Sequence, residues 1–142
     1  TRSLDDLTTM FTQVWIVLPP RGEAKDFEAV VNKVFKTFGD SDARCAVLLP
    51  GDERSAKLVQ DSIDVNAQFF LDTDFKVCDA LGVTALPALV HIRQDTSVAN
   101  IANGFNVEEW NATCKKIATA LRWTSPSFGD FKNKAAIKYP VK

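Results

Sequence analysis

The chain has 142 residues, 46% hydrophobic and 25% charged, which is enough to bury the core of one domain and excludes a disordered tail protein. Seventeen basic and eighteen acidic side chains give a formal net charge of −1, which argues against nucleic acid or an anionic membrane as a partner. No run approaches the roughly 18 apolar residues of a membrane-spanning helix, and no leader sequence opens the chain. We expect a soluble domain without membrane insertion. A cytoplasmic protein and an exported domain with a trimmed leader both stay open.

Three widely spaced cysteines, Cys45, Cys78 and Cys114, and a single histidine, His91, are the residues that most often carry redox or metal chemistry. No two cysteines stand as CxxC, so the spacing supplies neither a zinc site nor a dithiol motif. An odd count is typical of a reducing compartment, where a buried cysteine packs as a small apolar side chain. We expect no metal and no cofactor, and at most one internal disulfide, for which Cys45 and Cys78 are a conceivable pair.

Short apolar runs alternate with amphipathic stretches along most of the chain, as in an α/β domain. The clearest helix is predicted over 23–38, where apolar residues recur three and four positions apart. In chain order the pattern predicts strands at 13–18, 45–49, 68–71, 88–92 and 98–102, and helices at 23–38, 53–63, 74–81 and 107–121. This order argues for helices on both faces of one sheet whose early strands are parallel through right-handed crossovers.

The last predicted helix has the most distinct start. Asn106 with Glu109 three residues on resembles a capping box, and the dipeptide Asn103-Gly104 just before it suits a turn with positive φ. The apolar residues of this helix recur at helical spacing, which places Cys114 on the face toward the core.

A basic tail follows this helix, and the pattern of buried residues stops at Thr124. We therefore divide the chain into a domain, 1–123, and a tail, 124–142. The tail holds four lysines and one aspartate, net +3, whereas residues 51–80 hold seven acidic and three basic side chains, net −4. The tail either lies across that acidic surface or is loose, although its aromatic residues are unusual in a linker.

The stretch Leu71–Ile92, LDTDFKVCDALGVTALPALVHI, resembles a segment of the thioredoxin-like superfamily in which a short helix leads into a cis-proline and the next strand. The resemblance implies an α/β fold, a thioredoxin-like three-layer α/β/α sandwich with a mixed central sheet, and makes Pro87 the cis-proline, with Leu86 before it. The strand and helix predicted over Cys45–Ile63 resemble the insertion found in the branch of TlpA-like reductases and peroxiredoxins.

The sequence departs from the family where the reactive cysteine belongs. In the family that cysteine follows the first long strand, at the N-terminus of the next helix, where the helix stabilises a thiolate. Residues 19–25 read PPRGEAK and hold no cysteine, and the peroxiredoxin threonine is missing as well. Dithiol exchange and peroxide reduction both require a thiolate nucleophile. We therefore expect a non-catalytic protein.

Non-catalytic members of the family hold extended peptides by backbone hydrogen bonds in the groove beside the cis-proline. By this resemblance the groove would be bordered by Arg21, Gly22, Glu23, Leu86 and Pro87. Gly22 permits close backbone approach, and the Arg21 guanidinium suits a carboxylate or phosphate. We expect a binding or scaffolding module for a peptide or protein partner.

Two alternatives stay open. A monothiol redox protein or sensor would act through Cys78, although helical spacing with Leu81 turns that thiol inward, as in a packed core cysteine. A homo-oligomer or a larger assembly would use Trp123 or the tail. His91 shares a strand face with Arg93, and we interpret the lone histidine as structural rather than catalytic.

Overall fold

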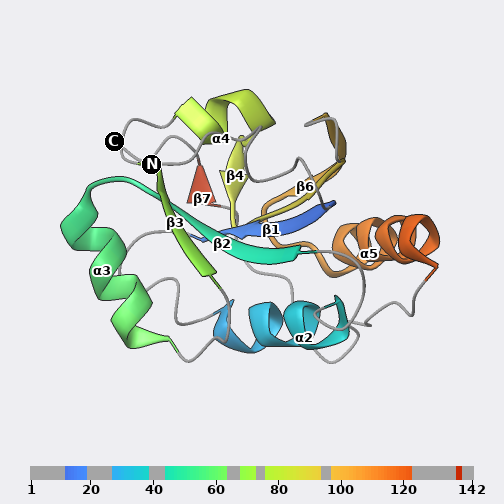
Figure 1. Ribbon diagram of the computed structural model, residues 1–142, viewed down its shortest axis with the longest axis horizontal. Helices are drawn as coiled ribbons and strands as arrows, with labels where there is room; N and C mark the ends of the chain where they lie inside the picture. Colours follow the sequence, from blue (N-terminus) through green and yellow to red (C-terminus); the bar gives the residue numbers. More distant parts are fainter. Residues whose placement is uncertain are drawn as a thin grey trace.

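A five-stranded mixed sheet forms the centre of the computed structural model (Figure 1), which describes residues 12–18, 27–38, 44–63, 68–72, 76–93, 97–122 and 137–138. The strand order is β3-β2-β1-β5-β6. The strands are β1 (Gln13–Val17), β2 (Arg44–Pro50), β3 (Gln68–Asp72), β5 (Ala88–Ile92) and β6 (Val98–Asn103). β1, β2 and β3 are parallel, while β5 is antiparallel to both of its neighbours.

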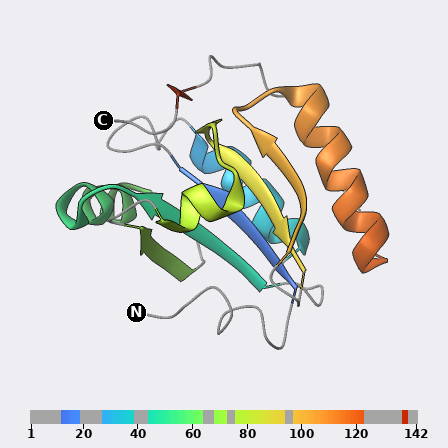
Figure 2. The same ribbon diagram turned by 90° about the horizontal axis from the view of Figure 1, so that it is seen from above.

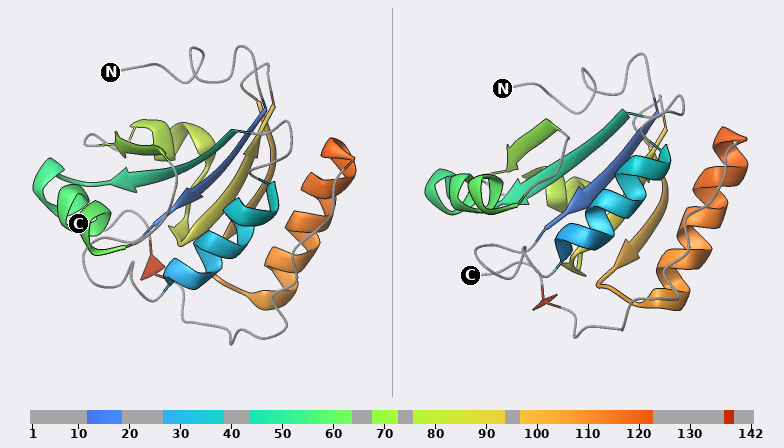
Figure 3. Two further views of the ribbon diagram at one scale, coloured as in Figure 1. Left: turned by 60° about the horizontal axis from the view of Figure 1, so that its bottom comes forward. Right: turned by 90° about the horizontal axis from the view of Figure 1, so that it is seen from below.

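Helices cover both faces of this sheet, so the predicted three-layer arrangement is confirmed. The helices are α2 (Glu28–Phe38), α3 (Glu53–Ser62), α4 (Lys76–Leu81) and α5 (Val107–Leu121). α2 and α5 run side by side over one face (Figure 3), whereas α4 crosses the other face (Figure 2). α3 contributes Ala56 and Val59 to the core under α2, and Ile63, directly after the helix, joins them. Within the described residues no helix is long and apolar enough to span a membrane.

A second, two-stranded sheet lies on the α4 side. Its strands are β4 (Ala85–Leu86) and β7 (Ile137–Lys138). Neither strand was predicted from the sequence, because two residues are too few to show a hydrophobic period.

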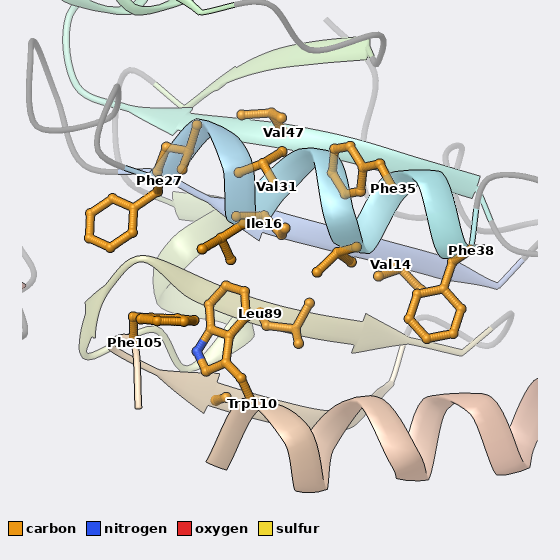
Figure 4. Packing of buried hydrophobic residues seen from close by; sticks show 14 of the residues in the cluster. Val14, Ile16, Phe27, Val31, Phe35, Phe38, Val47, Leu89, Phe105 and Trp110 are labelled. Carbon is orange, nitrogen blue, oxygen red and sulfur yellow. The ribbon is translucent and has the colours of Figure 1, made fainter. Parts of the chain in front are cut away.

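Alternation along the strands divides the core into two layers. Val14 and Ile16 of β1 face α2 and α5, where they meet Phe35, Phe38 and Trp110 (Figure 4). The residues between them, including Trp15, belong to the cluster on the α4 side. Strands that are buried on both faces read as continuous apolar runs, which is why the sequence predicted them correctly.

Polar contacts define the start of α5. The Asn106 side chain accepts a hydrogen bond from the Glu109 backbone N–H at 3.0 Å, as the capping pattern predicted. The Trp110 indole N–H donates to the Gly104 carbonyl at 2.8 Å, and Gly104 has φ +78°. The turn is thus fixed from inside the core, and Cys114 is buried as expected.

His91 is buried against Thr12 at the far end of β5. The Thr12 hydroxyl donates to the Ile92 carbonyl at 2.8 Å and lies 2.9 Å from His91 Nε2. Because a hydroxyl has one hydrogen, Nε2 is the donor in this contact, and Nδ1 is left as an acceptor. Among the described residues Nδ1 has no hydrogen-bond partner. Burial, followed by the charge of Arg93, lowers the pKa of His91, so the ring is held neutral.

Replacing Asn106 with Ala should lower the free energy of unfolding by about 1 kcal/mol, because the Glu109 N–H loses its acceptor. Denaturant unfolding of the full chain measures this change. The Asn106→Asp variant is the control, since a carboxylate oxygen accepts the same bond. An alanine variant as stable as the wild type would show that the cap contributes nothing.

The stability of the fold should fall as the pH drops below about 6.5, the pKa of an unperturbed histidine. Because the pKa of His91 is lower in the folded chain, the unfolded chain binds a proton at His91 at a higher pH than the folded chain does. The stabilisation is therefore complete above pH 6.5 and is lost as the pH falls toward the pKa of the folded state. Unfolding curves between pH 5 and pH 8 measure it. His91→Gln should flatten the profile, because His91 is the only histidine.

Candidate functional site

The two residues of β4 stand directly before Pro87, whose peptide bond with Leu86 is cis, as the resemblance implied. The Leu86 side chain is fully buried in the cluster that contains Trp15 and Cys78. Leu86 was predicted to border a groove, and the structure leaves only its backbone for that role. The Ala85 side chain is half-buried.

The side chain of Asn103, the last residue of β6, holds the start of β4. Its Oδ1 accepts hydrogen bonds from the backbone N–H groups of Thr84 at 2.7 Å and Ala85 at 3.4 Å. Asn103 pairs with Ala88 in the main sheet, so the contact connects β4 to the rigid part of the fold. From the sequence, Asn103 was predicted only as a turn residue, because nothing local in the sequence indicates that it contacts a residue 18 positions earlier.

The backbone of β4 pairs with β7 from the C-terminal tail (Figure 1). The pairing is antiparallel, with Ala85 opposite Lys138 and Leu86 opposite Ile137. Residues 137–138 therefore lie on β4. The rest of the tail, for which we expected either a loose chain or a position across 51–80, lies outside the described residues.

The direction of the backbone groups follows from the alternation along a strand. The N–H of Ala85 points to Asn103, and successive residues of a strand present their backbone groups to opposite sides. The N–H and C=O of Leu86 therefore point to the other side, where Ile137 is its partner. A single residue of β4 thus presents a backbone donor and acceptor to whichever strand lies beside it.

Three predicted border residues, Arg21, Gly22 and Glu23, lie outside the described residues. Trp123 and most of the tail lie outside them as well. The structure therefore brings together Leu86 and Pro87 of the predicted site and leaves the Arg21 side of it a prediction.

Cys78, the candidate thiol, is completely buried in α4. Its backbone N–H donates to Asp72 Oδ2 at 2.8 Å, and the Val77 N–H donates to Oδ1 of the same carboxylate at 3.1 Å. Asp72 is itself buried at the end of β3, so it fixes the first turn of α4 to the sheet. The sequence placed Cys78 inward correctly, and Asp72 as an anchor of this helix went unrecognised.

None of the three cysteines forms a disulfide. Burial raises the pKa of Cys45 and of Cys114 to about 12. Cys45 packs against the core layer under α2, whereas Cys78 belongs to the layer under α4. The sheet lies between these two side chains, so the Cys45–Cys78 disulfide that the sequence left conceivable does not form. No group of three metal-ligating side chains occurs in the described part of the chain.

Two pockets are lined by described residues, and neither lining includes a residue of β4. One, of about 530 Å³, lies at the opposite end of β5, where His91, Arg93 and Asn100 face the end of α5. The buried Nδ1 of His91 does not open into it, because almost none of that atom's surface is accessible to solvent. The other pocket, of about 630 Å³, lies along the exposed side of α3.

No family model and no curated protein matches this sequence. Solved structures do match its fold. A Chlorobium tepidum protein assigned as the thiol:disulfide interchange protein DsbE superposes with a TM-score of 0.67 at 13% identity, covering 82% of this chain and 84% of its own. The exposed lipoprotein thioredoxin Etrx1 of Streptococcus pneumoniae gives 0.60 at 15% identity, with coverage of 84% and 88%.

A third match is DsbF of Mycobacterium tuberculosis, solved in mixed oxidised and reduced forms, with a TM-score of 0.61 at 15% identity and coverage of 82% and 84%. Identities this low establish the fold and leave the activity open. The central mixed sheet and the helices on both faces make up the fold that these structures share with the chain. The chain has a thioredoxin-like fold of the kind seen in DsbE-like proteins, and its described residues contain no cysteine pair.

Proposed function

We propose that this protein is a binding module that holds an extended segment of a partner protein along β4. The observation that carries the proposal is the antiparallel pairing of β4 with β7. That pairing means that an extended chain fits beside Ala85 and Leu86 and is held through the backbone, as in β-strand addition.

The surroundings of β4 favour binding because they fix its backbone before any partner arrives. Leu86 anchors the strand from inside the core, and the Asn103 amide fixes its start. A strand that is already ordered loses little conformational entropy on binding, so more of the interaction energy appears as affinity. Arg21, Gly22 and Glu23 would border the bound segment, and the opposite charges of Arg21 and Glu23 would add selectivity.

The burial of the cysteines argues for binding rather than redox chemistry. The matched structures include proteins named as thioredoxins and disulfide interchange proteins, whose chemistry needs an accessible thiolate. In this chain Cys78 is fully buried, and Cys45 and Cys114 have a pKa of about 12. A monothiol function at Cys78 is the second candidate, supported by its place in the cluster beneath Leu86.

Peptide binding tests the main proposal. The probe is a fluorescently labelled peptide of residues 133–142, NKAAIKYPVK, which contains the segment seen on β4. The target is the full chain carrying Ile137→Pro, because proline has no N–H to donate to Leu86 and so frees the edge. We expect saturable binding by fluorescence anisotropy.

The same measurement on Asn103 variants locates the site. Asn103→Ala in the same background should weaken binding by about fivefold, the equivalent of about 1 kcal/mol, because the start of β4 loses its acceptor. Asn103→Asp keeps an acceptor oxygen and should restore most of the affinity. Asn100→Ala, in the same strand but lining the distant pocket, is the matched control. No binding, or equal loss in the Asn100 and Asn103 variants, would refute the proposal.

Timed alkylation of the native chain at pH 6 and pH 8 separates the two candidate functions. At pH 8 a thiol with a pKa of about 12 is ionised in about one molecule in ten thousand. We expect Cys45, Cys78 and Cys114 to react only in denaturant, as read by peptide mapping. Rapid modification of Cys78 at pH 6 would instead support the monothiol protein.

A further inference from the structure

We propose that β7 is a built-in competitor for β4, so that the C-terminal tail regulates access of a partner segment to the binding strand. The proposal rests on the function proposed above and adds a way in which binding of the partner segment is regulated. The evidence is the position of β7: it occupies the backbone groups that a partner would need.

Occupation of β4 by the tail and by a partner is mutually exclusive. The Ala85 N–H is taken by Asn103 on one side of β4. The Leu86 N–H and C=O point to the other side, and Ile137 is paired with them there. Since one residue offers the only outward donor and acceptor of this two-residue strand, a second extended chain must displace the tail.

The tail pairing is short, and this makes it displaceable. β7 has two residues, and each backbone hydrogen bond contributes only about 0.5–1.5 kcal/mol net. A free segment of that length would bind poorly. The stretch 123–136 joins it to α5 in the same chain, however, and a covalent connection of about this length gives an effective concentration on the order of millimolar. The form in which β7 is paired with β4 is therefore favoured only slightly. A partner segment that pairs with β4 over more residues can replace the tail.

The strength of this competition can be expressed as a ratio of affinities. If the tail peptide alone binds the free edge with a dissociation constant near 0.1–1 mM, a millimolar effective concentration weakens a competing ligand by about 2- to 10-fold. The regulation is graded, so a modest change in the tail changes the affinity for the partner.

The experiment compares three full-length chains with the same labelled peptide of residues 133–142. Ile137→Pro removes the donor of β7, whereas Ile137→Val keeps the backbone N–H and serves as the matched control. We expect the proline variant to bind the peptide about 2- to 10-fold more tightly than the wild type, and the valine variant to bind like the wild type. Circular dichroism should be the same for all three, since β7 is not part of the main sheet. In denaturant, the proline variant should lose no more stability than the 2- to 10-fold closure ratio, about 0.4–1.4 kcal/mol.

The possible failures can be told apart. If no chain binds the peptide, the proposed function and its regulation both fall. If the wild type and the proline variant bind equally well, peptide binding stands and the regulatory role of the tail is refuted. If the wild type forms concentration-dependent dimers in sedimentation and the proline variant does not, β7 pairs with β4 of a second copy, which overturns competition within one chain.

Discussion

Burial of both faces of the two central strands is the constraint on which the rest of the structure depends. β1 and β5 are buried along their whole length, so each needs a cover above and below. α2 and α5 cover one face with long apolar stripes. α4 has six residues, too few to cover the other face, and Leu86 of β4 completes that layer beside Trp15. The strand that we assign to binding is therefore also part of the core, and this double role holds its backbone in place.

The sequence predicted the sheet and its helices because their signals are local and periodic. The run Cys45–Leu49 appears as the middle of β2, the run Ala88–Ile92 is β5, and the cap at Asn106 is made as expected. The family resemblance predicted Pro87 in the cis form. In each case the residues that carry the information lie within one element or one turn.

The candidate site was harder to predict, because its contacts join residues far apart in the chain. β4 and β7 are about fifty positions apart and too short for any hydrophobic period to appear. Asn103 is a residue type typical of turns. The hydrogen bond that it accepts from the Thr84 N–H depends on where the end of β6 lies in three dimensions. Leu86 was assigned to a groove because of its neighbour Pro87, whereas packing under α4 directs its side chain inward.

The sheet also separates Cys78 from the other two cysteines. Cys45 and Cys114 belong to one layer of the core and Cys78 to the other, and a disulfide needs Cα atoms about 4.4–6.8 Å apart with side chains facing one another. Cys45 and Cys78 therefore stay unlinked to each other in both reducing and oxidising surroundings. A thioredoxin-like scaffold built in this way can neither gain nor lose a disulfide across its sheet when the redox potential around it changes.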